Sequence, residues 1–125
     1  MLIAVKTKKI LIIDDDEINI FIFNKTLSKC NFESELKSFT NPINALSYIA
    51  DTNNECDLIF LDLHLPEMSG EDFIHHFNQT IERNIPIVIV TSSIDELLEQ
   101  KIKTLPNVKD FLSKPITVEK IQAMV

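Results

Sequence analysis

The most informative stretch of the chain is Cys56-Asp57-Leu58-Ile59-Phe60-Leu61-Asp62-Leu63-His64-Leu65-Pro66-Glu67-Met68-Ser69-Gly70. Its apolar run, Leu58 to Leu61, is long enough for a buried strand and too short for most helices. Asp62 stands where the run ends. Pro66 and Gly70, the only glycine in the chain, then predict a loop before the next helix. Ligands of open parallel sheets gather at the carboxyl ends of the strands, so Asp62 is a candidate functional residue.

Size and composition predict one domain, residues 1–125, with an ordinary core, because 45% of the 125 residues are hydrophobic. No segment approaches the roughly 18–20 uninterrupted apolar residues of a membrane helix, so we expect no membrane partner. The apolar segment Met1–Val5 is too short for a signal peptide. A net charge of −7 argues against direct nucleic-acid binding. Cys30 and Cys56 lack metal-site spacing, which favours partly buried, reduced thiols in a cytoplasmic protein.

Strand-like and helix-like patterns alternate along the whole chain. The predicted strands cover residues 10–13, 32–39, 58–61, 87–90 and 108–112, and the predicted helices cover about 17–29, 42–50, 69–81, 93–102 and 117–125. Such alternation predicts parallel strands joined by right-handed crossovers. We therefore expect an α/β fold with a five-stranded, doubly wound parallel sheet. Charged residues within 32–39 favour an edge strand, and the wholly apolar 87–90 favours a strand buried on both faces.

Helix starts and apolar faces follow from local patterns. Caps are predicted at Asn41 before Pro42, at Ser69 with Asp72, at Ser93 with Glu96, and at Thr117. Apolar faces are predicted at Ala45, Leu46, Ile49 and Ala50; at Phe73, Ile74, Phe77 and Ile81; at Leu97, Leu98 and Ile102; and at Val118, Ile121 and Val125. The first helix is apolar on most faces in its first half, so we expect it to be well buried, with Phe21 and Phe23 in the core. Lys6, Lys8 and Lys9 are expected to be a solvated segment ahead of the first strand.

Polar side chains follow four of the predicted strands. They are Asp14 with Asp15, Asp62, Thr91 with Ser92, and Lys114. This topology brings them to one edge of the sheet, where carboxylates, a hydroxyl and an ammonium suit a phosphoryl group and Mg²⁺, which prefers oxygen ligands. Two unit charges about 4 Å apart repel by roughly 4 kcal/mol at an effective dielectric near 20, so clustered carboxylates favour a bound cation.

The segments Ile13-Asp14-Asp15, Leu61-Asp62 with Pro66 and Gly70, Thr91-Ser92 and Lys114-Pro115 together resemble the receiver domain of two-component response regulators. The resemblance covers essentially the whole chain, with the motifs in the same order. It implies the flavodoxin-like receiver fold with strand order 2-1-3-4-5. Because these residues include no DNA-binding domain, we expect a stand-alone receiver of the chemotaxis-regulator type.

The resemblance also implies roles for individual residues. Asp62 matches the phosphorylated aspartate, Asp15 a direct Mg²⁺ ligand, Asp14 the acidic partner that holds the metal through water, and the backbone carbonyl of His64 a further ligand. Lys114 matches the lysine that pairs with phosphoryl oxygens and Pro115 the cis-proline after it. Thr91 and Phe111 match the switch pair, a hydroxyl that moves toward the phosphoryl group and an aromatic that follows it inward.

Three features depart from the usual pattern of the family. His64 stands where many relatives have Asn or another polar residue, and with Ser93 it is expected to tune the lifetime of the phosphorylated form. Asn107 replaces a frequent glycine before the last strand, and Asn tolerates the left-handed conformation. The final helix is short for the family.

His75 and His76 are neighbours on a helix that point about 100° apart, which predicts surface histidines rather than a metal site.

These features predict a non-enzymatic phosphoacceptor that assists its own phosphorylation and autodephosphorylation. The implied partners are a sensor histidine kinase or phosphotransfer protein and a downstream effector protein, with a monomer or a weak phosphorylation-dependent dimer as the expected state. The main alternative is a receiver-like module that binds partners without being phosphorylated. An aspartyl-phosphate phosphohydrolase would need a second Asp where His64 stands, and a nucleotide- or flavin-binding domain would need a glycine-rich loop after the first strand.

Overall fold

A computed structural model describes residues 6–93 and 95–125, so the apolar segment Met1–Val5 lies outside the described residues. Strands and helices alternate as β1 (Lys8–Ile13), α1 (Glu17–Leu27), β2 (Ser34–Phe39), α2 (Pro42–Ala50), β3 (Leu58–Asp62), α3 (Gly70–Thr80), β4 (Ile87–Thr91), α4 (Glu96–Lys103), β5 (Val108–Ser113) and α5 (Val118–Met124). The predicted α/β alternation is therefore confirmed. Within the described part of the chain, no helix is long and apolar enough to cross a membrane.

The strands form one parallel sheet in the order β2-β1-β3-β4-β5, as the resemblance implies. β3 and β4 are buried along their whole length, because both faces of the sheet are covered. β2 lies at one edge and alternates half-buried with exposed residues, which confirms the predicted edge strand. This order places the ends of β1, β3 and β4 next to one another.

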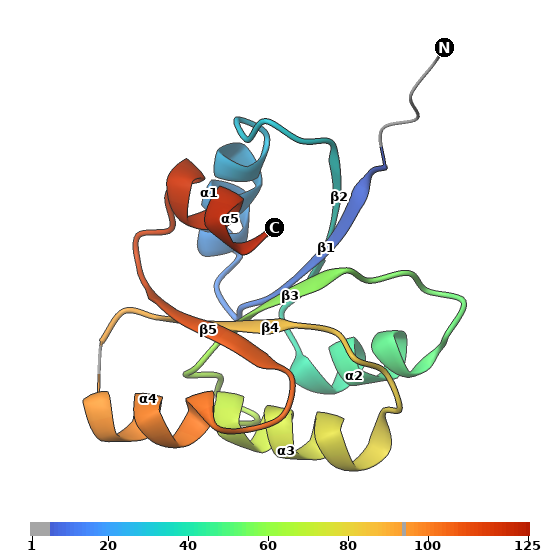
Figure 1. Ribbon diagram of the computed structural model, residues 1–125, viewed down its shortest axis with the longest axis vertical. Coiled ribbons are helices and arrows are strands. Elements are labelled where there is room, and N and C mark those ends of the chain that lie inside the picture. The colour runs from blue at the N-terminus through green and yellow to red at the C-terminus, as the bar shows by residue number, and fades with distance from the viewer. Residues whose placement is uncertain (1–5, 94) are drawn as a thin grey trace.

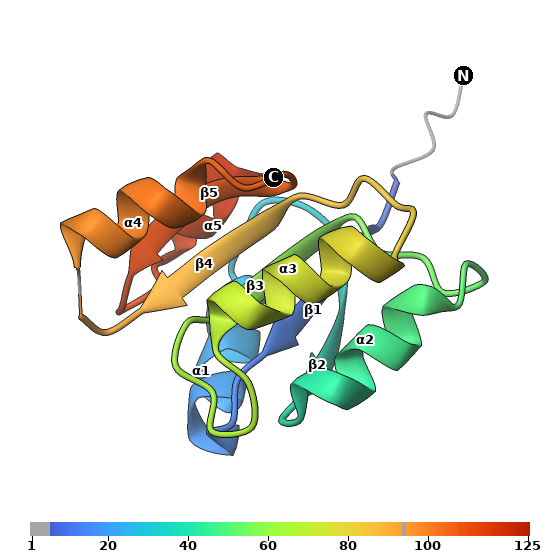
Figure 2. The ribbon, with the colours of Figure 1, turned by 90° about the horizontal axis from the view of Figure 1, so that it is seen from below.

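Helices cover the two faces unequally. α1 and α5 pack on one face, while α2, α3 and α4 lie side by side across the other (Figures 1 and 2). On the three-helix face, buried residues such as Ile49, Phe73, Phe77 and Ile102 pack against β3 and β4 residues such as Ile59 and Ile89. On the two-helix face, Phe23 packs against Phe60 with ring centroids 4.9 Å apart, beside Leu27 and Ile121.

The predicted burial of α1 is wrong for its first half. Ile18, Phe21 and Ile22 are 69%, 61% and 54% exposed, whereas Phe23 and Leu27 are buried. The helix is apolar on more than one face, but only one of its faces meets the sheet. α1 therefore contributes an exposed apolar surface near the carboxyl edge of the sheet.

Most of the predicted helix caps are confirmed. The side-chain oxygen Oδ1 of Asn41 accepts from the Ile43 amide at 2.8 Å. Ser69 Oγ accepts from the Asp72 amide at 3.1 Å, and Thr117 Oγ1 accepts from the Lys120 amide at 3.2 Å. The Ser93–Glu96 capping box is wrong. α4 is capped by Asp95, whose Oδ1 accepts from the amides of Leu97 and Leu98 at 3.2 Å each.

Smaller differences concern the ends of elements. Ala50 and Leu97 are both predicted to lie on apolar faces, but both are exposed, Leu97 to 80%. Ile102, predicted on the same face as Leu97, is buried. At the end of α5, Met124 rather than Val125 is buried. Lys8 and Lys9 belong to β1 itself, where the Lys9 ammonium pairs with Glu35 at 2.6 Å.

Two local predictions agree with the structure. Asn107 adopts the left-handed conformation with φ 71°, and its side-chain amide donates to Asn78 Oδ1 at 2.9 Å. Cys30 and Cys56 are free, half-buried thiols. Burial raises the pKa of the Cys56 thiol to about 11, which keeps it protonated and unreactive at neutral pH.

Candidate functional site

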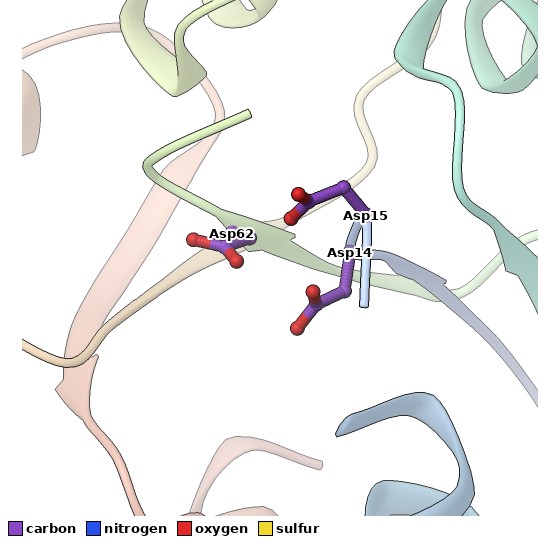
Figure 3. Close-up of side chains that lie close together, drawn as sticks. All are labelled: Asp14, Asp15 and Asp62. Carbon is purple, nitrogen blue, oxygen red and sulfur yellow. The ribbon is translucent and has the colours of Figure 1, made fainter. Parts of the chain in front are cut away.

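The strand ends bring the predicted acidic residues together. Asp14 and Asp15 follow β1, and Asp62 is the last residue of the neighbouring strand β3. Each offers a carboxylate oxygen, and these oxygens lie within 4.8 Å of one another. Figure 3 shows the three side chains projecting from the two strand ends into one space.

Asp14 is held in place by backbone and side-chain bonds. It is buried, and its Oδ1 accepts from the Asp16 amide at 2.9 Å. Its own amide donates to the Phe39 carbonyl at 3.1 Å, which ties the end of β1 to the end of β2. Its Oδ2 lies 3.3 Å from the Lys114 ammonium. A buried carboxylate of this kind is oriented by the fold before any ligand arrives.

Asp62 is buried, with 9% of its surface exposed. Its Oδ1 accepts from the His64 amide at 3.0 Å, and its Oδ2 lies 3.4 Å from the Lys114 ammonium. Burial raises the pKa of the Asp62 carboxyl above its ordinary value of 3.8. The His64 amide and the Lys114 ammonium lower it, whereas the charge of Asp14 raises it further. Burial therefore dominates, and the ionised form is held at a cost to the fold.

Lys114 bridges the two buried acids from the loop after β5. Desolvation lowers the pKa of its ammonium, but the Asp62 and Asp14 carboxylates outweigh that effect, so the pKa lies above its ordinary value of 10.5. The Lys114 amide donates to the Thr91 carbonyl at 2.8 Å, which fixes the start of the loop against the end of β4. The Lys114–Pro115 peptide bond is cis, as the resemblance implies.

The acidic cluster fits a hard divalent cation. It has three carboxylates against the one ammonium of Lys114, and oxygen ligands are those that Mg²⁺ prefers. Asp15 is exposed, so an ion can reach the cluster from solvent. Asp14, Asp15 and Asp62 are the residues that would hold it. The contribution of the His64 carbonyl remains a prediction, and the His64 side chain is exposed.

The loop after Asp62 depends on the single glycine of the chain. The Gly70 amide donates to the Leu63 carbonyl at 2.8 Å, closing the loop on itself. A Cβ atom at position 70 would lie 3.0 Å from Leu63 Cα and 3.2 Å from Leu63 Cδ1. Only glycine lets α3 begin this close to the end of β3 without displacing Leu63, the residue next to Asp62.

The predicted switch residues are both buried, and their roles remain predictions. Thr91 is the last residue of β4; its hydroxyl donates to the Ser93 carbonyl at 2.8 Å and accepts from the Ser93 amide at 3.2 Å. Phe111 lies on the three-helix face, 8% exposed, opposite Ile89 in the sheet register. The hydroxyl of Thr91 is thus engaged in its own turn.

Two features of the site are not predicted by the sequence. A cavity of about 380 Å³ lies against Asp14, Asp62 and Lys114, with its other walls formed by α1 and the loop after β5, including Ile22 and Ile116. Lys120 of α5 donates to backbone carbonyls of the loop that carries Lys114. Both depend on contacts between segments far apart in sequence or on the path of a loop, for which no local pattern gives a signal.

Comparisons with known proteins agree with this geometry. The family model for the response regulator receiver domain matches residues 10–125. A two-component response regulator of Oryza sativa subsp. japonica is 25% identical over 115 residues, covering 91% of this chain and 19% of its own length. A two-component response regulator-like protein of Arabidopsis thaliana is 27% identical over 121 residues, covering 96% of this chain and 16% of its own. The chain thus spans less than a fifth of these curated relatives.

Solved structures show the same fold. A two-component response regulator from Cytophaga hutchinsonii superposes with a TM-score of 0.85 at 24% identity, covering 95% of this chain and 94% of that one. The signal receiver domain of a LuxO repressor protein from Vibrio parahaemolyticus superposes with a TM-score of 0.80 at 23% identity, covering 95% and 87%. With the family match over nearly the whole length and the acidic cluster at the expected strand ends, this chain belongs to the response regulator receiver domain family.

Proposed function

We propose that this receiver domain accepts a phosphoryl group on Asp62 from a phosphohistidine and thereby changes a surface that other proteins recognise. The observation that carries the proposal is the shared Lys114 ammonium, 3.3 Å from Asp14 and 3.4 Å from Asp62, beside the three-carboxylate cluster. Phosphoryl transfer depends mostly on positioning and charge balance, and these are what the strand ends supply.

Each residue would have a role set by its position in the site. A carboxylate oxygen of Asp62 would attack phosphorus while the bond from phosphorus to the histidine nitrogen breaks, leaving an aspartyl phosphate and a free imidazole. The Lys114 ammonium would pair with phosphoryl oxygens. Asp14 and Asp15 would hold Mg²⁺, which when bound neutralises charge on the transferring group. Asp62 would act as the acceptor in its own phosphorylation and dephosphorylation, not as a catalyst for a separate substrate.

We propose that the phosphodonor, a sensor histidine kinase or phosphotransfer protein, docks over the exposed first half of α1. Ile18, Phe21 and Ile22 are more than half exposed there, and Ile22 lines the cavity that reaches Asp62. Contiguous exposed apolar side chains commonly mark protein interaction sites. A downstream effector and a cytoplasmic location belong to the same proposal, and the free thiols of Cys30 and Cys56 suit a reducing compartment.

The test is the intact mass of the protein after incubation with Mg²⁺ and acetyl phosphate. We expect a single phosphoryl adduct that is absent in Asp62→Asn and absent after chelation of the metal. Asp72→Asn, which removes an acid from the first turn of α3, is the matched control and should retain the adduct. No adduct on the wild-type protein, together with no response of its NMR spectrum to beryllofluoride, would favour the module that binds partners without phosphorylation.

A further inference from the structure

The loop that carries Lys114 is held by a second lysine. Lys120 lies in the first turn of α5, and its ammonium donates to the Ser113 carbonyl at 2.8 Å and to the Pro115 carbonyl at 3.0 Å. These carbonyls belong to the residues immediately before and after Lys114. With the bond from the Lys114 amide to the Thr91 carbonyl, the backbone around Lys114 is fixed from both sides.

The position of Lys120 is not one that local electrostatics favours. The first turn of a helix carries partial positive charge, so a cation there is disfavoured. Side chains on a helix lean toward its N-terminus, which carries the Lys120 stem back over the preceding loop. There the Lys120 ammonium donates to two carbonyl oxygens, and hydrogen bonds with a charged donor are among the stronger ones. The two hydrogen bonds to the loop offset the unfavourable interaction of the Lys120 charge with the N-terminus of α5.

The contacts of the Lys114 ammonium explain why the position of the Lys114 backbone affects the position of the ammonium. Its distances of 3.3 Å and 3.4 Å to Asp14 and Asp62 lie beyond the usual 2.7–3.2 Å of a hydrogen bond, so these contacts alone do not fix it tightly. The side chain starts from the backbone segment that Lys120 holds. A shift of that segment would move the ammonium relative to the carboxylates.

We propose that Lys120 is a positioning residue for phosphoryl transfer, which acts by holding the Ser113–Pro115 backbone so that the Lys114 ammonium stays between Asp14 and Asp62. This inference rests on the proposed function for its kinetic consequence. The Lys120 ammonium bonds to the two loop carbonyls, and the Lys120 amide bonds to the Thr117 hydroxyl that caps α5. None of these bonds reaches either acid, so we expect Lys120 to act through Lys114.

The experiment compares the rate of adduct formation from acetyl phosphate in Lys120→Met, Lys120→Arg and Lys109→Met. Lys120→Met removes the donors and keeps the apolar stem, and we expect it to slow the reaction about 10-fold, as losses of outer-shell partners do at metal sites. Lys120→Arg keeps donors for both carbonyls and should restore most of the rate. Lys109→Met is the matched control, because Lys109 of β5 also donates to a carbonyl of α5, that of Met124, away from the Lys114 loop.

Two further measurements separate positioning from general damage. In the background of Lys114→Met, which is itself expected to be slow, Lys120→Met should cause no additional slowing, because its effect passes through Lys114. Hydrogen exchange of the Lys114 amide should be faster in Lys120→Met than in the wild type or in Lys109→Met. A wild-type rate in Lys120→Met, an equal effect of Lys109→Met, or additive slowing in the double variant would overturn the assignment.

Failure of the proposed function is distinguishable from failure of this inference. If the wild-type protein forms no adduct, the proposed function falls and the exchange of the Lys114 amide decides the role of Lys120. Faster exchange in Lys120→Met, restored in Lys120→Arg, would then support its hold on the loop. Unchanged exchange would overturn it.

Discussion

Asp62 brings a carboxylate into a buried position beside Asp14, with Lys114 as the shared cation. Because burial raises the pKa of Asp62, the folded protein binds its proton more readily than the unfolded chain does. Ionisation therefore costs stability. The cost is fully present above the folded pKa and disappears as the pH falls to the ordinary value of 3.8.

We predict that Asp62→Asn is more stable than the wild type at pH 7 in the presence of a chelator. The expected gain in the free energy of unfolding is on the order of 1 kcal/mol, the size of one unfavourable interaction between partly screened charges. The gain should shrink as the pH is lowered and vanish near pH 4, as measured by urea unfolding at several pH values. Glu82→Gln, at an exposed loop position, should show no such trend. A gain independent of pH would contradict the assigned cause.

Asp15 differs from the other two acids of the cluster because it is exposed. Substitution there should leave the fold intact and affect cation binding selectively. We predict that Mg²⁺ at about 100 times its Kd stabilises the wild type by about 2.7 kcal/mol, as binding to the native state requires. Asp15→Asn should lose most of this gain in thermal unfolding with and without Mg²⁺. Glu17→Gln, which neutralises an acid nearby in α1 but outside the cluster, should keep it. Equal Mg²⁺ responses in both variants would show that the cation binds elsewhere.

At the scale of elements, α1 combines two surfaces that the sequence does not distinguish. Phe21 and Phe23 are two residues apart in the same helix, yet Phe21 is 61% exposed and Phe23 is 4% exposed and packs on Phe60. A helix presents positions two apart to different sides, so only one of them can face the sheet.

We predict that the two phenylalanines differ sharply when truncated. Phe23→Ala should destabilise the protein by about 3–5 kcal/mol, the usual cost of emptying an aromatic core site. Phe21→Ala should cost no more than about 0.5 kcal/mol, as surface substitutions usually do. Chemical unfolding of the two variants under the same conditions measures the difference. Comparable losses would mean that the exposed half of α1 is covered in solution, for example by a second molecule.

The central elements were predictable because β1, β3 and β4 end in a sharp change of residue type. The apolar runs at β1, β3 and β4 stop at acids or a hydroxyl, and the caps at Asn41, Ser69 and Thr117 are local hydrogen bonds that sequence patterns specify. For the same reason the sequence alone could place Asp14, Asp15 and Asp62 at one edge of the sheet. Their proximity follows from the parallel order of the strands.

The start of α4 could not be predicted in this way. Ser93 has the residue type of a cap, but its amide and carbonyl bond to the Thr91 hydroxyl, and the helix begins later, after its cap at Asp95. That competition depends on the turn after β4. The hold of Lys120 on the Lys114 loop gave no signal in the sequence either, because a lysine on a short helix is ordinarily a solvated residue.

At the scale of the molecule, β4 and β5 connect the acidic site to the core on the three-helix face. Thr91 ends β4 and pairs in register with Ser113, while Phe111 of β5 lies two residues earlier against Ile89. Phe111 belongs to the same core as Ile102 of α4. A change at the Thr91 turn can therefore reach both the helix that follows it and the strand beside it.

In the proposed switch, the exchange of one hydrogen bond would provide the coupling. In this structure the Thr91 hydroxyl donates to the Ser93 carbonyl at 2.8 Å, in the turn that leads into α4. To donate to a phosphoryl oxygen on Asp62 it must give up that bond, which would loosen the turn ahead of Asp95. A ligand shifts such an equilibrium only through its different contacts in the two states, and in the proposed switch the Thr91 hydroxyl would supply that difference.

We predict that beryllofluoride with Mg²⁺ shifts backbone amide resonances of α4 and β5 as well as those of the Asp62 loop. In Thr91→Ala the shifts should be confined to the Asp62 loop, because no hydroxyl remains to exchange partners. Thr26→Ala removes a hydroxyl that bonds within α1, to the Ile22 carbonyl at 2.9 Å, and should behave as the wild type does. If wild-type shifts stop at the Asp62 loop, Thr91 and Phe111 do not carry the signal. If Thr91→Ala shows the full set of shifts, α4 and β5 respond through another route, for which the Lys114 loop between β5 and α5 is the nearest physical connection.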